Sequence, residues 1–268
     1  MYARTYRSTL AALLLASALV LAGNPPAARA QAVLTNEHAD IALGFSGGVW
    51  DLHVHDEDND LEFDPADVLL FVGPEARTGR PAGAAFDFIG VGAGENYWRL
   101  PQTQNPDLLF LGVSAGEVAS GTFGSYNPFD ESGGRVSGSG PWLRLDLLGV
   151  SGPGHFSVWQ STDTGPLVFM SSFQNGVDGS DSLWIREGSH AHFNYGFTEA
   201  GLYDITVKAS GLIGGQRVES GPVTYRFGVE TRSAVIPEPG SVALLIAAAS
   251  PVGAATLLRS RRRRKASA

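Results

Sequence analysis

Short segments in which apolar and polar residues alternate are the feature that most limits how this chain can fold. They recur throughout residues 31–231, and no long stretch there has the 3.6-residue period of an amphipathic helix. Turns rich in glycine, proline and serine separate them, and 34 Gly and 15 Pro in 268 residues suit many short strands better than helices. The sequence therefore predicts an all-β fold, an antiparallel β-sandwich of the Ig-like or jelly-roll-like kind. Strands are expected at 40–45, 49–55, 68–72, 108–113, 142–149, 155–160, 167–171, 182–185, 191–197, 202–209 and 223–230.

Residues 1–30 have the pattern of a secretory signal peptide. Two arginines precede an apolar run at 10–22, and the small residues Ala28 and Ala30 mark a cleavage site before Gln31. The apolar run is shorter than the ~20 residues that a membrane-spanning helix needs, which favours a cleaved signal over an anchor. The chain is therefore expected to be exported across the inner membrane.

The C-terminal segment, residues 232–268, contains three features in order. Pro237-Glu238-Pro239 comes first, an apolar run at 242–258 follows, and a basic cluster at 259–265 comes last. The apolar run predicts a transmembrane helix, and the positive-inside rule leaves the body of the protein outside the cell membrane. This order resembles the PEP-CTERM sorting signal of Gram-negative bacteria. The resemblance implies that an exosortase sorts the protein to the cell surface and that the anchor is either removed or retained.

Charge limits the partners of the body. Residues 31–235 contain ten Lys and Arg against 26 Asp and Glu, a net charge of −16. Such a surface repels phosphate backbones, so nucleic acid is excluded as a partner. The chain has no Cys, which removes disulfides, thiolate metal sites and cysteine nucleophiles. A metal ion would have to be bound by His, Asp, Glu or backbone oxygen.

The six histidines alternate away from the apolar residues of their own predicted strands. His53 and His55 form one H-x-H pair, and His190 and His192 form another. Residues two apart on a strand point to the same side, about 7 Å apart, which suits ligation of a single ion. With His38 nearby, the two pairs form a candidate site for Zn²⁺ or another divalent transition metal. His155 stands alone and is less suited to be a ligand.

The acidic run 56–60 has two interpretations, a calcium-binding loop and a solvated turn. Asp56, Asp58 and Asp60 match the start of a calcium loop, with Asp67 at its twelfth position. However, Leu61 stands where that loop needs glycine, and Asp67 replaces the usual glutamate. A solvated acidic turn is therefore favoured over a Ca²⁺ site.

Two classes of enzyme are alternatives to a binding protein. G-x-S-x-G occurs around Ser46 and Ser114, but neither serine is followed by the helix that a nucleophile elbow requires. A secreted metal-dependent hydrolase stays open as an alternative, because an ion in the His cluster could activate water. A purely structural or adhesive surface protein without metal is the other alternative.

Several segments resemble the choice-of-anchor M domain, a family of surface proteins. The most specific is Gly188-Ser189-His190-Ala191-His192-Phe193, within 188–198. Tyr195 stands where relatives often have Trp. The resemblance implies a secreted β-rich domain over 31–231 with no enzymatic activity, and actinobacterial relatives tend to accompany metal-uptake transporters. His38, His190 and His192 match its His-bearing motifs, and His53 and His55 correspond less closely. The other matching segments are 34–40, 50–57, 109–112, 152–160 and 201–207.

Together these features predict an exported, exosortase-sorted β-sandwich of the cell surface or extracellular matrix that binds a ligand and catalyses nothing. A divalent metal, an extracellular polysaccharide and neighbouring surface proteins are the candidate ligands.

Overall fold

A computed structural model describes residues 31–232 of the chain. Of these residues, 51% lie in strands and 6% in helices, so the all-β prediction is confirmed. Each of the eleven predicted strands overlaps an observed one. The predicted signal peptide with its cleavage site after Ala30, the motif Pro237-Glu238-Pro239 and the predicted C-terminal helix lie outside the described residues. Within the described part, no helix is long and apolar enough to span a bilayer.

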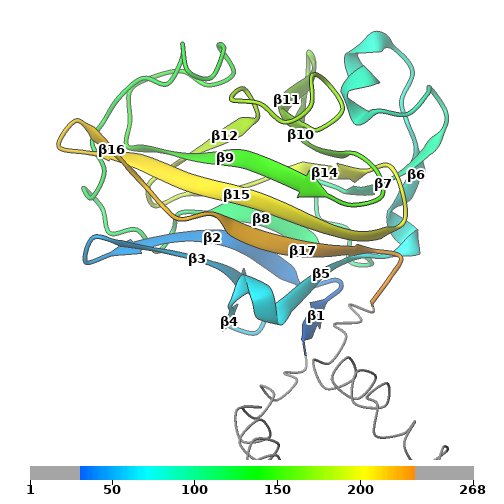
Figure 1. Cartoon of the computed structure of the whole chain (residues 1–268), viewed down its shortest axis with the longest axis horizontal. Coiled ribbons are helices and arrows are strands. Elements are labelled where there is room, and N and C mark those ends of the chain that lie inside the picture. Colours follow the sequence, from blue (N-terminus) through cyan, green and yellow to red (C-terminus); the bar gives the residue numbers. More distant parts are fainter. Residues whose placement is uncertain (1–30, 233–268) are drawn as a thin grey trace, which may run out of the picture. The chain divides into compact units, whose positions relative to one another are not determined.

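The strands form three sheets, shown in Figure 1. In sheet A the order is β1 (Ala32–Leu34), β5 (Val68–Val72), β17 (Val223–Val229), β15 (Gly201–Ile213), β9 (Trp142–Ser151) and β12 (Ser182–Arg186), and β16 (Gln216–Glu219) pairs with β15. In sheet B it is β13 (His190–His192), β8 (Phe110–Ser114), β2 (His38–Ser46), β3 (Val49–Asp56) and β4 (Leu61–Phe63). In sheet C it is β11 (Gly165–Ser171), β10 (Phe156–Thr162), β14 (Asn194–Phe197), β7 (Asn96–Leu100) and β6 (Arg77–Gly79).

Sheets A and B are mixed and sheet C is antiparallel, so the prediction of an antiparallel sandwich is wrong for two of the three sheets. The pairs β1–β5, β5–β17 and β2–β8 are parallel. Parallel neighbours need a long connection between them, and the chain supplies one by passing through β3 to β7 before β8 returns beside β2. Three short 3₁₀ helices lie in such connections: η1 (Pro65–Asp67), η2 (Pro74–Ala76) and η3 (Ala84–Ile89).

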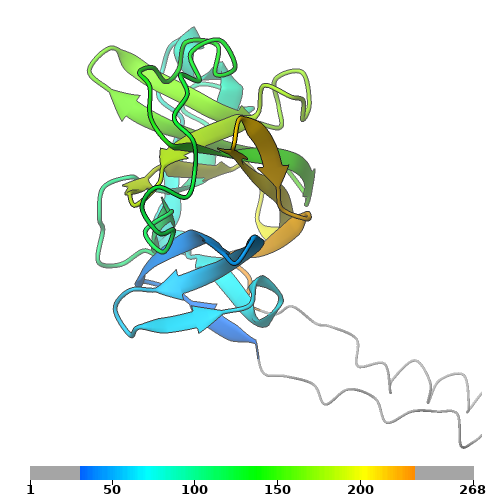
Figure 2. The ribbon, with the colours of Figure 1, turned by 90° about the vertical axis from the view of Figure 1, so that its left-hand side faces the viewer.

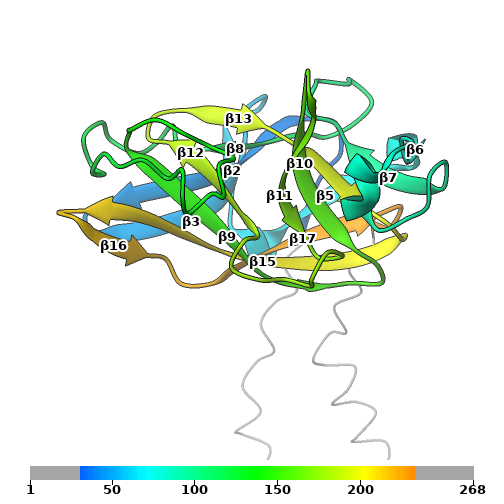
Figure 3. The same ribbon diagram turned by 90° about the horizontal axis from the view of Figure 1, so that it is seen from above.

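The main core lies between sheet B and the other two sheets. Figure 2 shows β2 and β3, in blue, in one layer and the yellow-to-orange strands of sheet A, β15 to β17, in another. Ile41 and Val113 of sheet B, Tyr225 and Phe227 of sheet A, and Phe156 of sheet C all line one small apolar cavity inside this core. In Figure 3 the long strand β15 extends along the domain, with β16 at one end. Alternation along each strand thus gives every sheet an apolar inner face.

The predicted strand 191–197 is two strands in two different sheets. β13 pairs with β8 in sheet B, whereas β14 pairs with β10 and β7 in sheet C. The buried Phe193 lies between them. The change of sheet after His192 leaves the H-x-H pair at the edge of sheet B, and this position determines what the pair can contact.

Candidate metal centre

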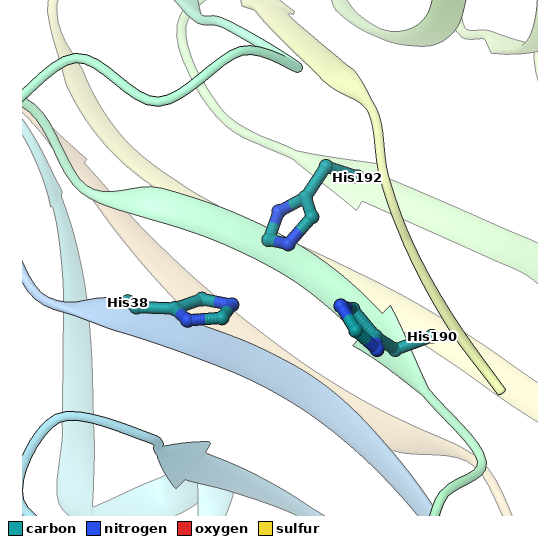
Figure 4. Close-up of side chains that lie close together, drawn as sticks. All are labelled: His38, His190 and His192. Atoms are coloured by element: carbon teal, nitrogen blue, oxygen red, sulfur yellow. The ribbon is translucent and has the colours of Figure 1, made fainter. Parts of the chain in front are cut away.

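Three histidines gather over strand β8. His38 is the first residue of β2, and His190 and His192 are the ends of β13. β8 lies between these two strands, with Phe110 opposite His38 and Gly112 opposite His192. Cross-strand partners point to the same side of a sheet. The three imidazoles consequently converge from two strands, as Figure 4 shows.

The spacing of these rings is close to that of a metal site. One ring nitrogen from each of His38, His190 and His192 lies within 4.8 Å of the others. The ring centroids are 5.0 Å apart for His38 and His192 and 5.6 Å apart for His190 and His192. Because Zn–N bonds are about 2.0–2.1 Å long, tetrahedral ligands lie about 3.3 Å from one another. Small side-chain rotations would therefore bring all three nitrogens onto one ion.

Several polar atoms at this position are buried and lack a hydrogen bond. They are His38 Nε2, His192 Nδ1 and Asp40 Oδ1, none of which has a partner among the described residues. Leaving a buried polar group unpaired costs about 1–3 kcal/mol, and native proteins seldom leave such groups unpaired. A cation bound among the histidines would satisfy the unpaired nitrogens of His38 and His192.

Asp40 lies on the same face as the histidines and is 1% exposed. It is opposite Gly112, which is in turn opposite His192, so these residues form one row across β2, β8 and β13. A Cβ atom at Gly112 would overlap Asp40 Oδ1 and lie 3.1 Å from His192 Nδ1. The missing side chain at Gly112 thus lets the carboxylate and the imidazole approach each other above β8.

Burial changes the protonation of two of these groups. Burial lowers the pKa of His192 to about 4, and the nearby charge of His38 lowers it further. The ring of Phe110 stacks on His192, with centroids 3.6 Å apart and planes at 5°. Burial also raises the pKa of Asp40 to about 6, although His38 opposes this. Near neutral pH, His192 is therefore neutral, which is the form that binds metals, and Asp40 is charged.

The five predicted metal ligands do not form a single group. The register places His53 opposite Ala42 and His55 opposite Asp40, so both share the sheet face of the cluster. However, β2 and β8 lie between β3 and β13. Three strand spacings of about 4.8 Å separate the two H-x-H pairs by about 14 Å, too far for one ion. His53 belongs to a second group, with Glu62 and Glu117.

His55 and His155 lie outside both groups. The ring of His55 is flanked by carboxylates, with Nδ1 3.2 Å from Glu57 and Nε2 3.5 Å from Asp60. His155 packs edge-to-face on Phe173, with centroids 4.9 Å apart. Neither residue is placed to share an ion with the cluster over β8.

The acidic run 56–60 stabilises a turn through its own side chains. Asp56 Oδ1 accepts hydrogen bonds from the backbone N–H groups of Asp58 and Asn59, which is typical of aspartate in turns. Asp58 Oδ2 accepts from the backbone N–H of His38 at 2.8 Å. These bonds fix the start of β2, where the cluster begins.

Sequence reasoning missed Asp40 and Glu117 as site residues. Asp40 is two residues after His38 in the same alternating segment, so the sequence did indicate that both side chains lie on one face. Glu117 lies in the connection after β8, where no periodicity indicates which way a side chain points. That connection packs against the domain, since its Val118 and Phe123 are buried in the core.

Comparison with known proteins finds no matching family model, no similar curated protein and no similar solved structure. The geometry of the histidine cluster is therefore the main guide to function.

The opposite pKa shifts of Asp40 and His192 give a testable pH dependence in metal-free protein. The raised pKa of Asp40 means that the folded state binds more protons than the unfolded state between about pH 4 and 6, so this group lowers stability as pH rises. The lowered pKa of His192 has the reverse effect between about pH 4 and 6.5.

Relative to the unsubstituted protein, Asp40→Asn should therefore gain stability as pH rises through this window, and His192→Gln should lose it. Urea unfolding in the presence of a chelator at several pH values measures both differences. Parallel pH profiles for all three proteins would contradict the assigned shifts.

Proposed function

We propose that this chain is an exported cell-surface β-sandwich protein that binds a divalent transition-metal ion through His38, His190 and His192 and catalyses no reaction. The convergence of three imidazoles from two strands is the observation that carries the proposal. The buried, unpartnered nitrogens of His38 and His192 support it, because an ion would replace the hydrogen bonds that they lack.

Zinc is the ion that best matches this set of donors. Imidazole nitrogens suit Zn²⁺ and its neighbours in the first transition series, and the chain has no thiol to compete. Asp40 is the fourth donor in this proposal, since its unpartnered Oδ1 lies in the same row as His192. Three nitrogens and one carboxylate oxygen make up a complete tetrahedral set.

The fourth donor also distinguishes a binding site from a hydrolase. Catalytic zinc sites keep one position open for water, whereas sites with four protein ligands are closed. A buried carboxylate beside the histidines favours the closed set. Hydrolytic turnover that a chelator abolishes would instead favour the metal-dependent hydrolase, and no response to any metal would favour a structural or adhesive protein.

Export and sorting are the second part of the proposal. The N-terminal pattern of residues 1–30 and the order of motif, apolar run and basic cluster in 232–268 support them. The choice-of-anchor M resemblance supports a surface location for the domain and connects it with metal uptake. In this proposal the exosortase machinery and the inner membrane are transient partners, and extracellular polysaccharide is a further candidate ligand.

Zinc should raise the melting temperature of the protein. A ligand that binds only the folded state at a hundredfold excess over its Kd adds about 2.7 kcal/mol, which corresponds to about 5–10 °C for a domain of this size. His190→Ala combined with His192→Ala should remove the rise, whereas the control His155→Ala should keep it. Protons compete for imidazole, so the rise should fade below about pH 6. Differential scanning calorimetry tests this, and an unchanged melting temperature with Zn²⁺, Mn²⁺ and Ni²⁺ would refute the proposal.

Gly112→Ala should weaken zinc binding although it replaces none of the ligands. The added methyl group would occupy the space between Asp40 and His192 and push them apart. A loss of at least about tenfold in affinity is expected, similar to the effect of disturbing the surroundings of other metal ligands. Gly149→Ala is the matched control, because a Cβ there meets no atom within 4 Å. Isothermal titration calorimetry compares the two, and equal affinities would argue against a site between these strands.

Deletion of residues 237–265 should release soluble protein from cells that express an exosortase. The deletion removes the sorting motif, the apolar run and the basic cluster together. Fractionation and immunoblotting measure the partition between membrane and medium. If the shortened protein stays with the membrane as before, the tail is not the anchor.

A further inference from the structure

A second group of potential ligands lies on the same sheet face. His53 of β3, Glu62 of β4 and Glu117, which follows β8, each have one ligand atom within 4.8 Å of the others. His53 is 5% exposed, and both glutamates are exposed. His53 Nε2 lies 3.1 Å from Glu117 Oε1. A buried imidazole is thus covered by two carboxylates at the surface.

The second nitrogen of His53 is arranged as in many metal-binding histidines. Its Nδ1 atom is buried, has no hydrogen-bond partner among the described residues, and lies 3.8 Å from Asp51 Oδ2. Histidines that bind a metal through one nitrogen usually donate the other N–H to a carboxylate or a carbonyl. A small movement of Asp51 would complete this arrangement, with Nε2 facing the glutamates.

The charge of this group also favours a cation. Glu62, Glu117 and Asp51 are three carboxylates around one imidazole, and no ion pair with Lys or Arg is found for any of them in residues 31–232. Asp51 and Glu117 also line an open surface groove of about 420 Å³, which gives a hydrated ion access to the group. Carboxylates brought together without a counter-ion repel one another, and a divalent ion would reverse this.

We propose that His53, Glu62 and Glu117 form a second, carboxylate-rich site for a divalent metal ion of the Mn²⁺ class, separate from the histidine cluster. Carboxylate oxygens suit Mn²⁺ more than a three-imidazole set does, and the single imidazole favours Mn²⁺ over Mg²⁺ and Ca²⁺. The two sites are independent, because His53 is in line with Ala42, Ser114 and His190 across the sheet. Three strand spacings, about 14 Å, separate them.

The competing explanation is a simple ion pair that attaches the connection after β8 to the sheet. Glu62 distinguishes the two, because it is a ligand in the proposed site but takes no part in the His53–Glu117 contact. It is exposed on a short edge strand, so Glu62→Gln should leave folding unaffected.

The test is a titration of the metal-free protein with Mn²⁺, in which the electron paramagnetic resonance signal of the free ion measures how much Mn²⁺ is bound. Glu62→Gln and Glu117→Gln should each weaken one binding event at least about tenfold. The control Glu75→Gln, an exposed glutamate of η2, should bind as the unsubstituted protein does. His190→Ala with His192→Ala should leave this event unchanged, so failure of the histidine cluster and failure of this site are distinguishable.

Equal Mn²⁺ binding by Glu62→Gln, Glu117→Gln and Glu75→Gln would overturn the proposal and leave an ion pair only. A loss with Glu117→Gln but none with Glu62→Gln would also overturn it, since a site of three ligands needs both glutamates.

Discussion

The parallel pairing of β2 with β8 is the constraint on which the histidine cluster depends. It places His38 and Asp40 beside Phe110 and Gly112, and the antiparallel pairing of β8 with β13 then adds His190 and His192 on the far side. An antiparallel β2 would give its residues different partners on β8. A sheet thus collects in one place residues that are about 150 positions apart in the chain.

Burial of the polar atoms in the histidine cluster lowers the stability of the folded protein as long as these atoms have no hydrogen-bond partners. Asp40 is almost fully buried with an unpaired oxygen, and His192 has a lowered pKa because it is poorly solvated. Such groups cost free energy unless hydrogen bonds or a cation compensate them. Metal binding would therefore stabilise the folded protein, and the site would favour an ion that accepts neutral imidazoles.

The sequence was sufficient for the fold class and for the faces of the strands. Alternation placed His53 and His55 opposite Leu52 and Val54, and the structure has them on that side of sheet B. The sequence could not predict the order of the strands, because alternation with a period of two carries no information about which strands are neighbours in a sheet. The two H-x-H pairs were consequently expected to share one ion, although two strands lie between them. Strand β7 was missed as well, and its buried Tyr97 and Trp98 became recognisable only from the pairing with β14.

A crystal structure of the zinc-soaked protein, with anomalous data on both sides of the zinc absorption edge, tests the central claim most directly. The account predicts an anomalous peak within about 2.0–2.2 Å of His38 Nε2, His192 Nδ1, one nitrogen of His190 and Asp40 Oδ1. In the structure one ring nitrogen from each of the three histidines already lies within 4.8 Å of the others, and Asp40 Oδ1 has to move toward them to complete the set. An anomalous map without a peak over β8, from crystals soaked at saturating zinc, would contradict the account.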